Sequence, residues 1–407
     1  TGDGMKAEAQ AIRNAQAAPP GEPYGAQRAA VMSRERFDAA LAEIASWPGY
    51  AATSLHRLDA LAARLGVAAL WYKDERSRFG LGSFKALGGA YAVANVLRGK
   101  VMAACGLANV TSQQLLSGAF AEIVRGATVT CATDGNHGRS VAWGAQLFGC
   151  RCVIFVHEHV SQGRREAIAR YGAEVREVKG NYDDAVRHAA ATAQANGWTV
   201  VSDTSYPGYR DIPLDVMHGY GVMAAEVADQ LDGRPPTHVF VQAGVGALAA
   251  AVCASFWLRW AERRPRFVVV EPLHADCVYR SLAAGRPVVV EGSLDTVMAG
   301  LACGEVSELA WEILRGGASA AVRLDDAYAL EAMKVLAAPA SGDPPLVAGE
   351  TGGAGLGALL AARDYPEMRA TLALDADSRV LLLGSEGDTD PAIYRRVVGR
   401  SAQEVLA

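Results

Sequence analysis

The chain has 407 residues, of which 51% are hydrophobic and 20% charged, so it can bury two domain cores and shows no compositional sign of disorder. Its formal net charge is -5 and no Lys/Arg cluster follows one predicted face, which argues against a nucleic-acid partner and favours a small molecule. The seven cysteines are scattered and odd in number, unlike a secreted disulfide framework.

The N-terminal segment predicts neither export nor membrane insertion. The first ten residues lack the basic start, apolar stretch and cleavage site of a secretory signal, so we expect a cytoplasmic protein. We expect a loose arm up to the Pro-bearing break near 18–26. The apolar run 239–258 has the length of a membrane span, but Gly244 and Gly246 divide it into a short strand and an alanine-rich helix, so no membrane segment is expected.

Short apolar runs alternate with helix-length segments along the rest of the chain. The predicted strands lie at 68–72, 127–132, 152–156, 198–202, 238–242, 267–271 and 380–384, and helices at 140–148, 162–171, 182–195 and 220–231. This alternation predicts a two-domain α/β fold, with mainly parallel sheets and helices on both faces. We expect residues 1–90 and 221–407 to form a large domain and residues 91–220 a small one.

The first unusual strand-to-helix junction is G-S-F-K-A-L-G-G, which contains Lys85. Parallel sheets bind ligands at the carboxyl ends of their strands, so such junctions are where chemistry is expected. Small and apolar neighbours, together with the positive end of the following helix, disfavour an ammonium ion at Lys85. The lysine is therefore a candidate nucleophilic amine that can form an imine. The alternative is a lysine that extends its amine to solvent.

The second junction, A-T-D-G-N-H-G-R, follows a predicted strand and precedes a helix. Backbone amides in such a turn hold anions, so Thr133 and residues 134–138 can receive a substrate carboxylate. Asn136 offers an amide to a ring oxygen. The alternative is an ordinary Asp-Gly turn that caps the helix.

The third junction is V-Q-A-G-V-G-A-L, where Gly244 and Gly246 let backbone amides approach a phosphate. It lacks the third glycine of the dinucleotide fingerprint and the Gly-Lys-Ser/Thr ending of a nucleotide P-loop, which disfavours a dehydrogenase or an ATPase.

The fourth junction, L-L-L-G-S-E-G-D-T-D-P, places Ser385 at the end of a strand, where its hydroxyl can meet a heterocycle's nitrogen. Asp388 and Asp390 suggest a cation site but lack the other ligands of a calcium loop. His157 and His159 share one face of a strand without a third or fourth ligand nearby. No metal site is therefore predicted.

The order of these four motifs resembles the fold type II pyridoxal-phosphate enzymes, such as tryptophan synthase β and threonine dehydratase. W-Y-K-D-E-R-S-R-F-G-L-G-S-F-K, A-T-D-G-N-H-G-R-S-V-A-W, N-Y-D-D-A-V and S-E-G-D-T-D-P further resemble the diaminopropionate ammonia-lyase family, over about Tyr50 to Tyr394. By this resemblance Lys85 carries pyridoxal 5'-phosphate as a Schiff base, Asn136 meets the ring hydroxyl oxygen and Ser385 faces the pyridine nitrogen. The phosphate cradle would consist of Gly244, Val245, Gly246, Ala247 and Leu248.

The resemblance also implies a reaction, α,β-elimination of 2,3-diaminopropionate to pyruvate and ammonia by a homodimer. In the family, Asp203 acts as the base toward the L-isomer and Asp134 toward the D-isomer. Two carboxylates also suit a substrate that carries a second ammonium group. The remaining predicted substrate-binding residues are Thr133, Gly135 and His137.

Two departures from the family pattern leave alternatives open. Residues 52–55 read A-T-S-L where the family has Pro-Thr-Pro-Leu, and Pro207 stands where a longer polar residue is usual. One alternative is a serine/threonine-type dehydratase or a β-replacement enzyme with the same cofactor. Another is a noncatalytic ligand-binding protein on the same scaffold.

Overall fold

The computed structural model describes residues 7–407. The first six residues, which belong to the stretch examined above for a secretory signal, lie outside the described part. The chain forms two compact units. Unit 1 comprises the chain up to Ser33, Ala52–Ser77 and Met223–Ala407, and unit 2 comprises Arg34–Ala51 and Arg78–Val222.

This division differs from the sequence-based one mainly in residues 34–51 and 78–90, which belong to unit 2. Aromatic packing gives the reason for the first of these segments. The ring of Trp47 lies 6.1 Å from that of Trp143 and 5.5 Å from that of Phe148, so the segment that carries Trp47 is held by the core of unit 2.

Unit 1 contains a seven-stranded sheet in the order β1-β10-β9-β8-β11-β3-β2. Its strands are β1 (Ala9–Arg13), β2 (Leu55–Arg57), β3 (Ala69–Asp74), β8 (His238–Gln242), β9 (Arg266–Pro272), β10 (Ala320–Leu324) and β11 (Arg379–Gly384). The two edge strands pair antiparallel and the five central strands run parallel. The prediction of a loose N-terminal arm is therefore wrong in part, because Ala9–Arg13 adds an edge strand to the sheet.

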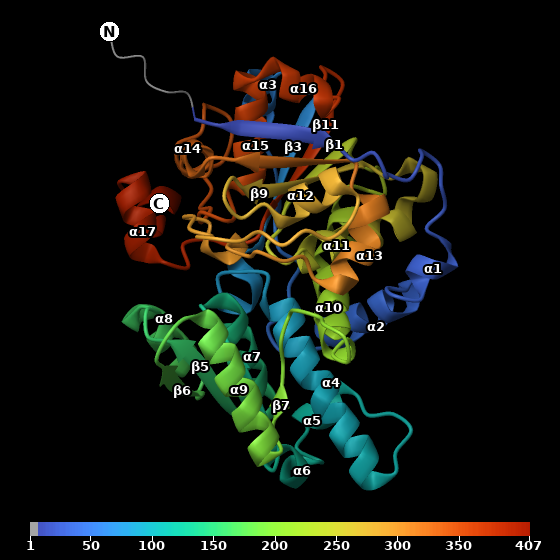
Figure 1. The fold of residues 1–407 in the computed structure, drawn as a ribbon, viewed down its shortest axis with the longest axis vertical. Helices are drawn as coiled ribbons and strands as arrows, with labels where there is room; N and C mark the ends of the chain where they lie inside the picture. The colour runs from blue at the N-terminus through green and yellow to red at the C-terminus, as the bar shows by residue number, and fades with distance from the viewer. Residues whose placement is uncertain (1–6) are drawn as a thin grey trace. The chain divides into compact units, whose positions relative to one another are not determined.

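Helices cover both faces of this sheet (Figure 1). One face buries Phe240, Val270 and Leu382 against α3, α14, α15 and α16, and it forms an apolar core of the unit. The helices of unit 1 are α1 (Gly25–Ala29), α3 (Asp59–Leu65), α11 (Ala247–Trp260), α12 (Cys277–Ala284), α13 (Glu308–Gly317), α14 (Asp326–Ala337), α15 (Ala354–Asp364), α16 (Pro366–Thr371), α17 (Pro391–Val398) and α18 (Ala402–Leu406), with short 3-10 helices η2 (Ala261–Arg263) and η3 (Ala299–Leu301).

Unit 2 contains a parallel four-stranded sheet in the order β6-β5-β4-β7. Its strands are β4 (Thr128–Ala132), β5 (Arg151–His157), β6 (Glu174–Val178) and β7 (Thr199–Val200). Its helices are α2 (Arg34–Ala45), α4 (Ala86–Cys105), α5 (Ser112–Leu116), α6 (Ala121–Arg125), α7 (Asn136–Phe148), α8 (Gln162–Ala169) and α9 (Tyr182–Asn196). Two elements continue from one unit into the other, the 3-10 helix η1 (Glu75–Gly80) and α10 (Asp211–Gln230).

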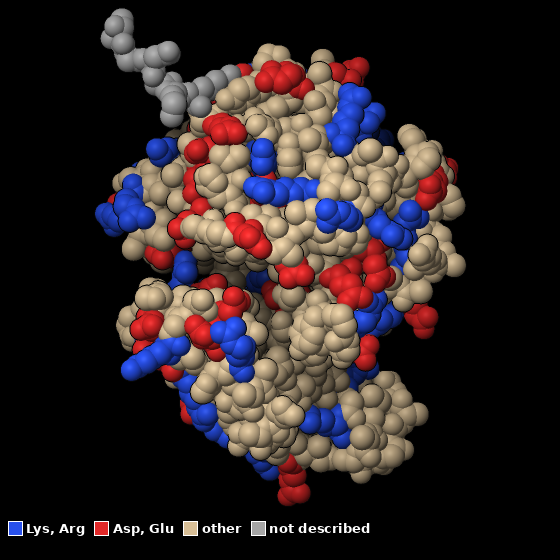
Figure 2. Space-filling view, viewed as in Figure 1, with Lys and Arg blue, Asp and Glu red and all other residues tan. Residues whose placement is uncertain are grey.

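The fold class is the predicted one, an α/β protein with mostly parallel sheets flanked by helices. Among residues 7–407, no helix is long and apolar enough to cross a membrane, since the apolar run at 239–258 divides into β8 and α11. On the face seen in Figure 2, acidic and basic side chains are intermixed and form no continuous basic band.

Candidate active site

Lys85 lies immediately before α4, and its amine faces a carboxylate within unit 2. Its Nζ is 3.0 Å from Oδ2 of Asp203, and its side chain is 23% exposed. The same nitrogen lies 5.4 Å from the ring centroid of Phe84 and 5.9 Å from that of Tyr220. The structure therefore places this lysine in a partly desolvated aromatic setting beside the Asp203 carboxylate, rather than extended into solvent.

The charge of Asp203 depends on that neighbour. Burial acts to raise the pKa of Asp203, but the Lys85 ammonium outweighs it and holds this pKa well below its ordinary value. The carboxylate is thus ionised beside a charged Lys85. Removing the positive charge from Lys85 would leave burial as the larger effect, so Asp203 would then become a stronger base.

His137, near the start of α7, lies on the other side of Asp203. Its Nε2 lies 2.8 Å from the carbonyl oxygen of Val201 and therefore carries the proton, since a carbonyl can only accept. Burial lowers the pKa of His137, which keeps the ring neutral. Its Nδ1 lies 3.9 Å from Oδ2 of Asp203 and has no hydrogen-bond partner in the described chain. His137 thus presents a lone pair to the aspartate.

The turn between β4 and α7 is held by Thr133. Its Oγ1 accepts hydrogen bonds from the backbone N–H groups of Gly135 and Gly138, both at 3.0 Å. A Cβ on Gly138 would lie 2.3 Å from Cγ2 of Thr133, so a side chain at this position is sterically excluded. Asn136 is the first residue of α7, where helix N–H groups lack acceptors within the helix.

Asp134 belongs to this turn but does not cap the helix. Its Oδ1 lies 2.9 Å from Nε2 of His157, at the end of the neighbouring strand. The structure therefore brings Lys85, Asp203 and His137 together, and it gives Asp134 a separate histidine partner.

The glycine loop of unit 1 has the geometry that its sequence predicts. A Cβ on Gly244 would lie 2.8 Å from the carbonyl oxygen of Gly300, and Gly246 has a φ of +93°, so both positions require glycine. The loop leads into α11, which begins at Ala247. The first N–H groups of that helix lack acceptors within the helix, so this main chain suits a phosphate.

Ser385 is buried at the end of β11 and hydrogen-bonded within unit 1. Its Oγ accepts a hydrogen bond of 2.7 Å from Nε2 of Gln242, so the hydroxyl proton is directed elsewhere. This arrangement suits an unprotonated pyridine nitrogen, which can only accept. Sequence reasoning missed Gln242, although its place just before the glycine loop was a signal. It also missed Tyr220, and the sequence pattern contained no signal for that residue.

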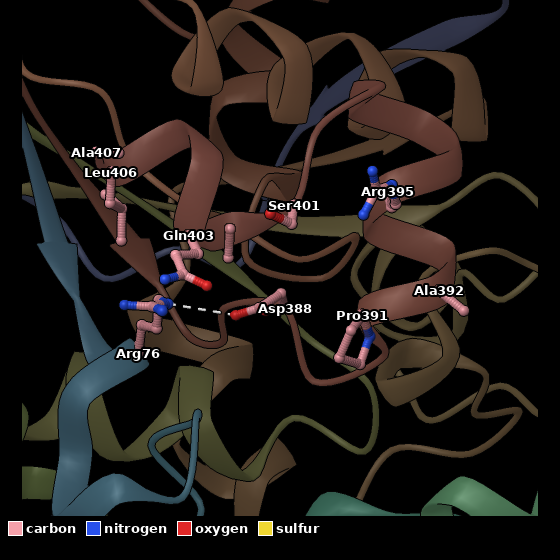
Figure 3. Close-up of a pocket in the computed structure, with 10 residues that line it drawn as sticks. Arg76, Asp388, Pro391, Ala392, Arg395, Ser401, Gln403, Leu406 and Ala407 are labelled. Carbon is pink, nitrogen blue, oxygen red and sulfur yellow. Dashed lines mark hydrogen bonds and ion pairs between the residues drawn. The ribbon is translucent and has the colours of Figure 1, made fainter.

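The residues that suggested cation sites have other partners. Asp388 forms an ion pair of 3.3 Å with Arg76, and Asp390 caps α17 by accepting the N–H of Ile393. Arg76 and Asp388 line an open groove beside α17 and α18 (Figure 3). Within the described chain, no group of three or more His, Cys, Asp or Glu side chains has a metal-binding arrangement.

Comparison with known proteins identifies the family. Residues 47–385 match the family of pyridoxal-phosphate dependent enzymes. The chain is 41% identical to diaminopropionate ammonia-lyase of Salmonella typhimurium over 366 residues, which cover 87% of this chain and 90% of that protein. It is 43% identical to the Escherichia coli K12 enzyme of the same name over 355 residues, covering 86% and 88%. This chain belongs to the diaminopropionate ammonia-lyase family.

A solved structure supports the family at the level of the fold. The crystal structure of the Escherichia coli diaminopropionate ammonia-lyase in complex with an aminoacrylate-PLP azomethine reaction intermediate matches with a TM-score of 0.85 and 38% identity, over 97% of both chains. The family cofactor, pyridoxal phosphate, fits the donors present here. Unit 2 offers the amine of Lys85, and unit 1 offers the glycine loop before α11 and the hydroxyl of Ser385, which are donors of the kinds that this cofactor uses.

Proposed function

We propose that this chain catalyses the pyridoxal-phosphate-dependent α,β-elimination of 2,3-diaminopropionate, which yields pyruvate and ammonia. The observation that carries the proposal is the 3.0 Å contact between Lys85 Nζ and Asp203 Oδ2, because it joins the amine that would bind the cofactor to a carboxylate that can act as a base. The identity to named diaminopropionate ammonia-lyases over 86–87% of the chain gives the reaction and the substrate class.

A different part of the chain would make each contact with the cofactor. Lys85 would bind the aldehyde, Asn136 the ring hydroxyl oxygen, and the main chain of Gly244, Val245, Gly246, Ala247 and Leu248 the phosphate. The bound cofactor supplies a ring that delocalises negative charge from the substrate Cα. Ser385 accepts a hydrogen bond from the side-chain amide of Gln242, so its own hydroxyl can donate a hydrogen bond to the ring nitrogen. A neutral hydroxyl leaves that nitrogen largely unprotonated, which suits elimination better than transamination.

The proton transfers follow from the charges in unit 2. Once Lys85 no longer carries an ammonium ion, burial raises the basicity of Asp203, and this carboxylate can take the α-proton of the L-isomer. Asp134, in the turn between β4 and α7, would act on the D-isomer. The proton that Asp203 takes can pass to the Lys85 amine 3.0 Å away, and the ammonium group so formed can protonate the leaving β-amine.

The predicted substrate contacts suit an amino acid with a second ammonium group. The turn that holds Thr133, Gly135 and His137 offers helix N-terminal amides to the substrate carboxylate. Asp134 and Asp203 supply negative charge for the two ammonium groups. A β-hydroxy substrate lacks one of these charges and would bind less favourably.

The experiment that tests the function combines spectrum and product ratio. The purified protein should show visible cofactor absorbance and release two ammonia per pyruvate from diaminopropionate. Lys85→Ala should abolish both the absorbance and turnover. One ammonia per pyruvate from L-serine or L-threonine, without turnover of diaminopropionate, would support a dehydratase instead. A protein that stays colourless with added cofactor would contradict enzymatic function of this class.

The two proposed bases can be distinguished by assaying the L-isomer and the D-isomer of the substrate separately. Asp203→Asn should impair the L-isomer more than the D-isomer, and Asp134→Asn should do the reverse. Equal losses on both isomers in both variants would contradict this assignment.

We further propose a cytoplasmic homodimer. The seven cysteines are all free thiols, which is consistent with a reducing compartment. The dimer is an expectation from the family. Light scattering of the purified protein tests it, and a monomer of 42.7 kDa would overturn it.

A further inference from the structure

The end of the parallel pair β4 and β5 places two side chains opposite each other. The ladder pairs Ala132 with Phe155, and the next backbone hydrogen bond runs from the N–H of Thr133 to the carbonyl of Phe155. Counting two residues beyond the last pair brings Asp134 opposite His157. The approach of these side chains is therefore a consequence of sheet register.

The hydrogen bonds of His157 define its tautomer. Its Nδ1 accepts the backbone N–H of His159 at 3.3 Å, so in the neutral ring the proton is on Nε2. That Nε2–H group points to Oδ1 of Asp134 at 2.9 Å. The histidine is thus a fixed donor to one carboxylate oxygen, while Oδ2 has no hydrogen-bond partner among the described residues.

The loop behind His157 is itself anchored. The side chain of Arg165 donates hydrogen bonds to the carbonyl oxygens of Glu158 and Val160, at 3.0 Å and 2.9 Å. Oε1 of Glu158 accepts the N–H of Gly180 at 2.8 Å. The side chain of His157 is 18% exposed whereas that of Asp134 is 50% exposed, so the histidine is the more enclosed partner.

We propose that His157 is a positioning residue that orients Asp134 for proton abstraction from the D-isomer of the substrate. This inference rests on the proposed function. A half-exposed aspartate can adopt several rotamers, and a donor that fixes Oδ1 restricts it to one of them, with Oδ2 left to accept the proton. Asp203 is held by the amine of Lys85 instead, so His157 serves one isomer only.

The test compares both isomers in the holoenzyme. His157→Ala should lower kcat for the D-isomer about ten- to hundredfold, with a smaller change in KM and less than about a twofold change for the L-isomer. His157→Gln keeps an amide donor near the Nε2 position and should recover most of the D-turnover. The control is His188→Gln, an exposed histidine of α9 that packs on Phe155, and it should leave both isomers unchanged.

A double variant separates this inference from the proposed function. If Asp134 is the D-specific base, Asp134→Asn loses D-turnover, and adding His157→Ala should cause no further loss. Loss of D-turnover in Asp134→Asn with normal D-turnover in His157→Ala would overturn the inference alone. Normal D-turnover in Asp134→Asn would overturn the base assignment and the inference with it. Equal loss of both isomers in His157→Ala would also overturn it, because L-turnover reports an intact fold.

A second measurement does not depend on turnover. In protein labelled with ¹⁵N-histidine, the His157 signals, identified by their loss in His157→Gln, should show a protonated Nε2 and an unprotonated Nδ1. Asp134→Asn should shift the Nε2–H resonance while leaving that of His188 in place. A protonated Nδ1, or a His157 signal unaffected by Asp134→Asn, would contradict the orientation proposed.

Discussion

At the scale of single residues, burial and one or two neighbours decide what each ionisable group does. Asp203 and Glu271 are both surrounded by protein, but Asp203 faces an ammonium ion and Glu271 does not. Glu271 ends β9 and accepts the backbone N–H groups of Val278 and Tyr279 at 2.8 Å and 2.6 Å. Burial outweighs these two bonds and raises the pKa of Glu271 to about 8.

This raised pKa predicts a pH-dependent stability. In the unfolded chain a glutamate titrates near about 4.3, so between about pH 4.3 and 8 the native state holds a proton that the unfolded state releases. Native-state stability should therefore fall as pH rises through this window, by at most about 1.4 kcal/mol per pH unit. Glu271→Gln cannot titrate, and its single side-chain oxygen replaces two acceptors, so one of the hydrogen bonds from Val278 and Tyr279 is lost. The variant should therefore be less stable than the wild type at pH 5 and approach it by pH 8. Urea unfolding at several pH values measures this, and parallel curves would contradict it.

At the scale of elements, glycine allows helices to approach closely. α4 and α7 pack against each other in unit 2, and a Cβ on Gly144 of α7 would lie 2.8 Å from Cα of Ala90 in α4. A backbone atom cannot move aside as a flexible side chain can. The contact therefore requires glycine on the facing side of α7.

Gly144→Ala should thus destabilise the protein by about 1–3 kcal/mol, because the two helices must separate. Gly99, within α4, provides the matched control, since a Cβ there would meet nothing within 4 Å. Gly99→Ala should stabilise the protein by about 0.5–1 kcal/mol through the lower entropy of the unfolded chain. Thermal unfolding compares the two, and a Gly144→Ala variant as stable as wild type would show that the packing is looser than the structure indicates.

The elements also show what the sequence could predict. Continuous β-branched runs such as His238–Gln242 predicted the central strands, because strands buried on both faces are apolar throughout. The pattern missed β6, which reads E-V-R-E-V at a sheet edge, and β10, where alanines resemble a helix. The start of α10 was also placed nine residues late, as Pro213 in its first turn resembles a break.

The candidate site was predicted as residues but not as contacts. Local motifs named Lys85 and Asp134, and the family resemblance named Asp203, yet the Lys85–Asp203 contact joins residues 118 positions apart, and no spacing rule reaches that far. His157 was considered only as a metal ligand. Its contact with Asp134 depends on the register between two strands, which a single sequence does not determine.

At the scale of the molecule, unit 1 is assembled from separate stretches of chain, and a buried ionic network joins two of them. Lys73 on β3 donates to Oε2 of Glu226 on α10, to the carbonyl of Thr53 and to the amide oxygen of Gln230, at 2.8, 2.8 and 3.0 Å. Lys73 is fully buried and Glu226 nearly so. The network therefore fixes Ala52–Ser77 to the stretch that begins at Met223.

Removing one charge from this pair should cost far more than removing both. Lys73→Met removes a buried cation that donates to the carboxylate of Glu226 at 2.8 Å, which is expected to destabilise the protein by about 3–5 kcal/mol. Lys73→Met combined with Glu226→Leu removes both charges and should recover much of that loss. Replacing a buried ion pair with apolar side chains of similar volume often leaves the free energy of unfolding unchanged. Denaturant unfolding of the wild type, both single variants and the double variant measures the coupling. Additive losses would mean that the two charges act independently and would contradict this coupling.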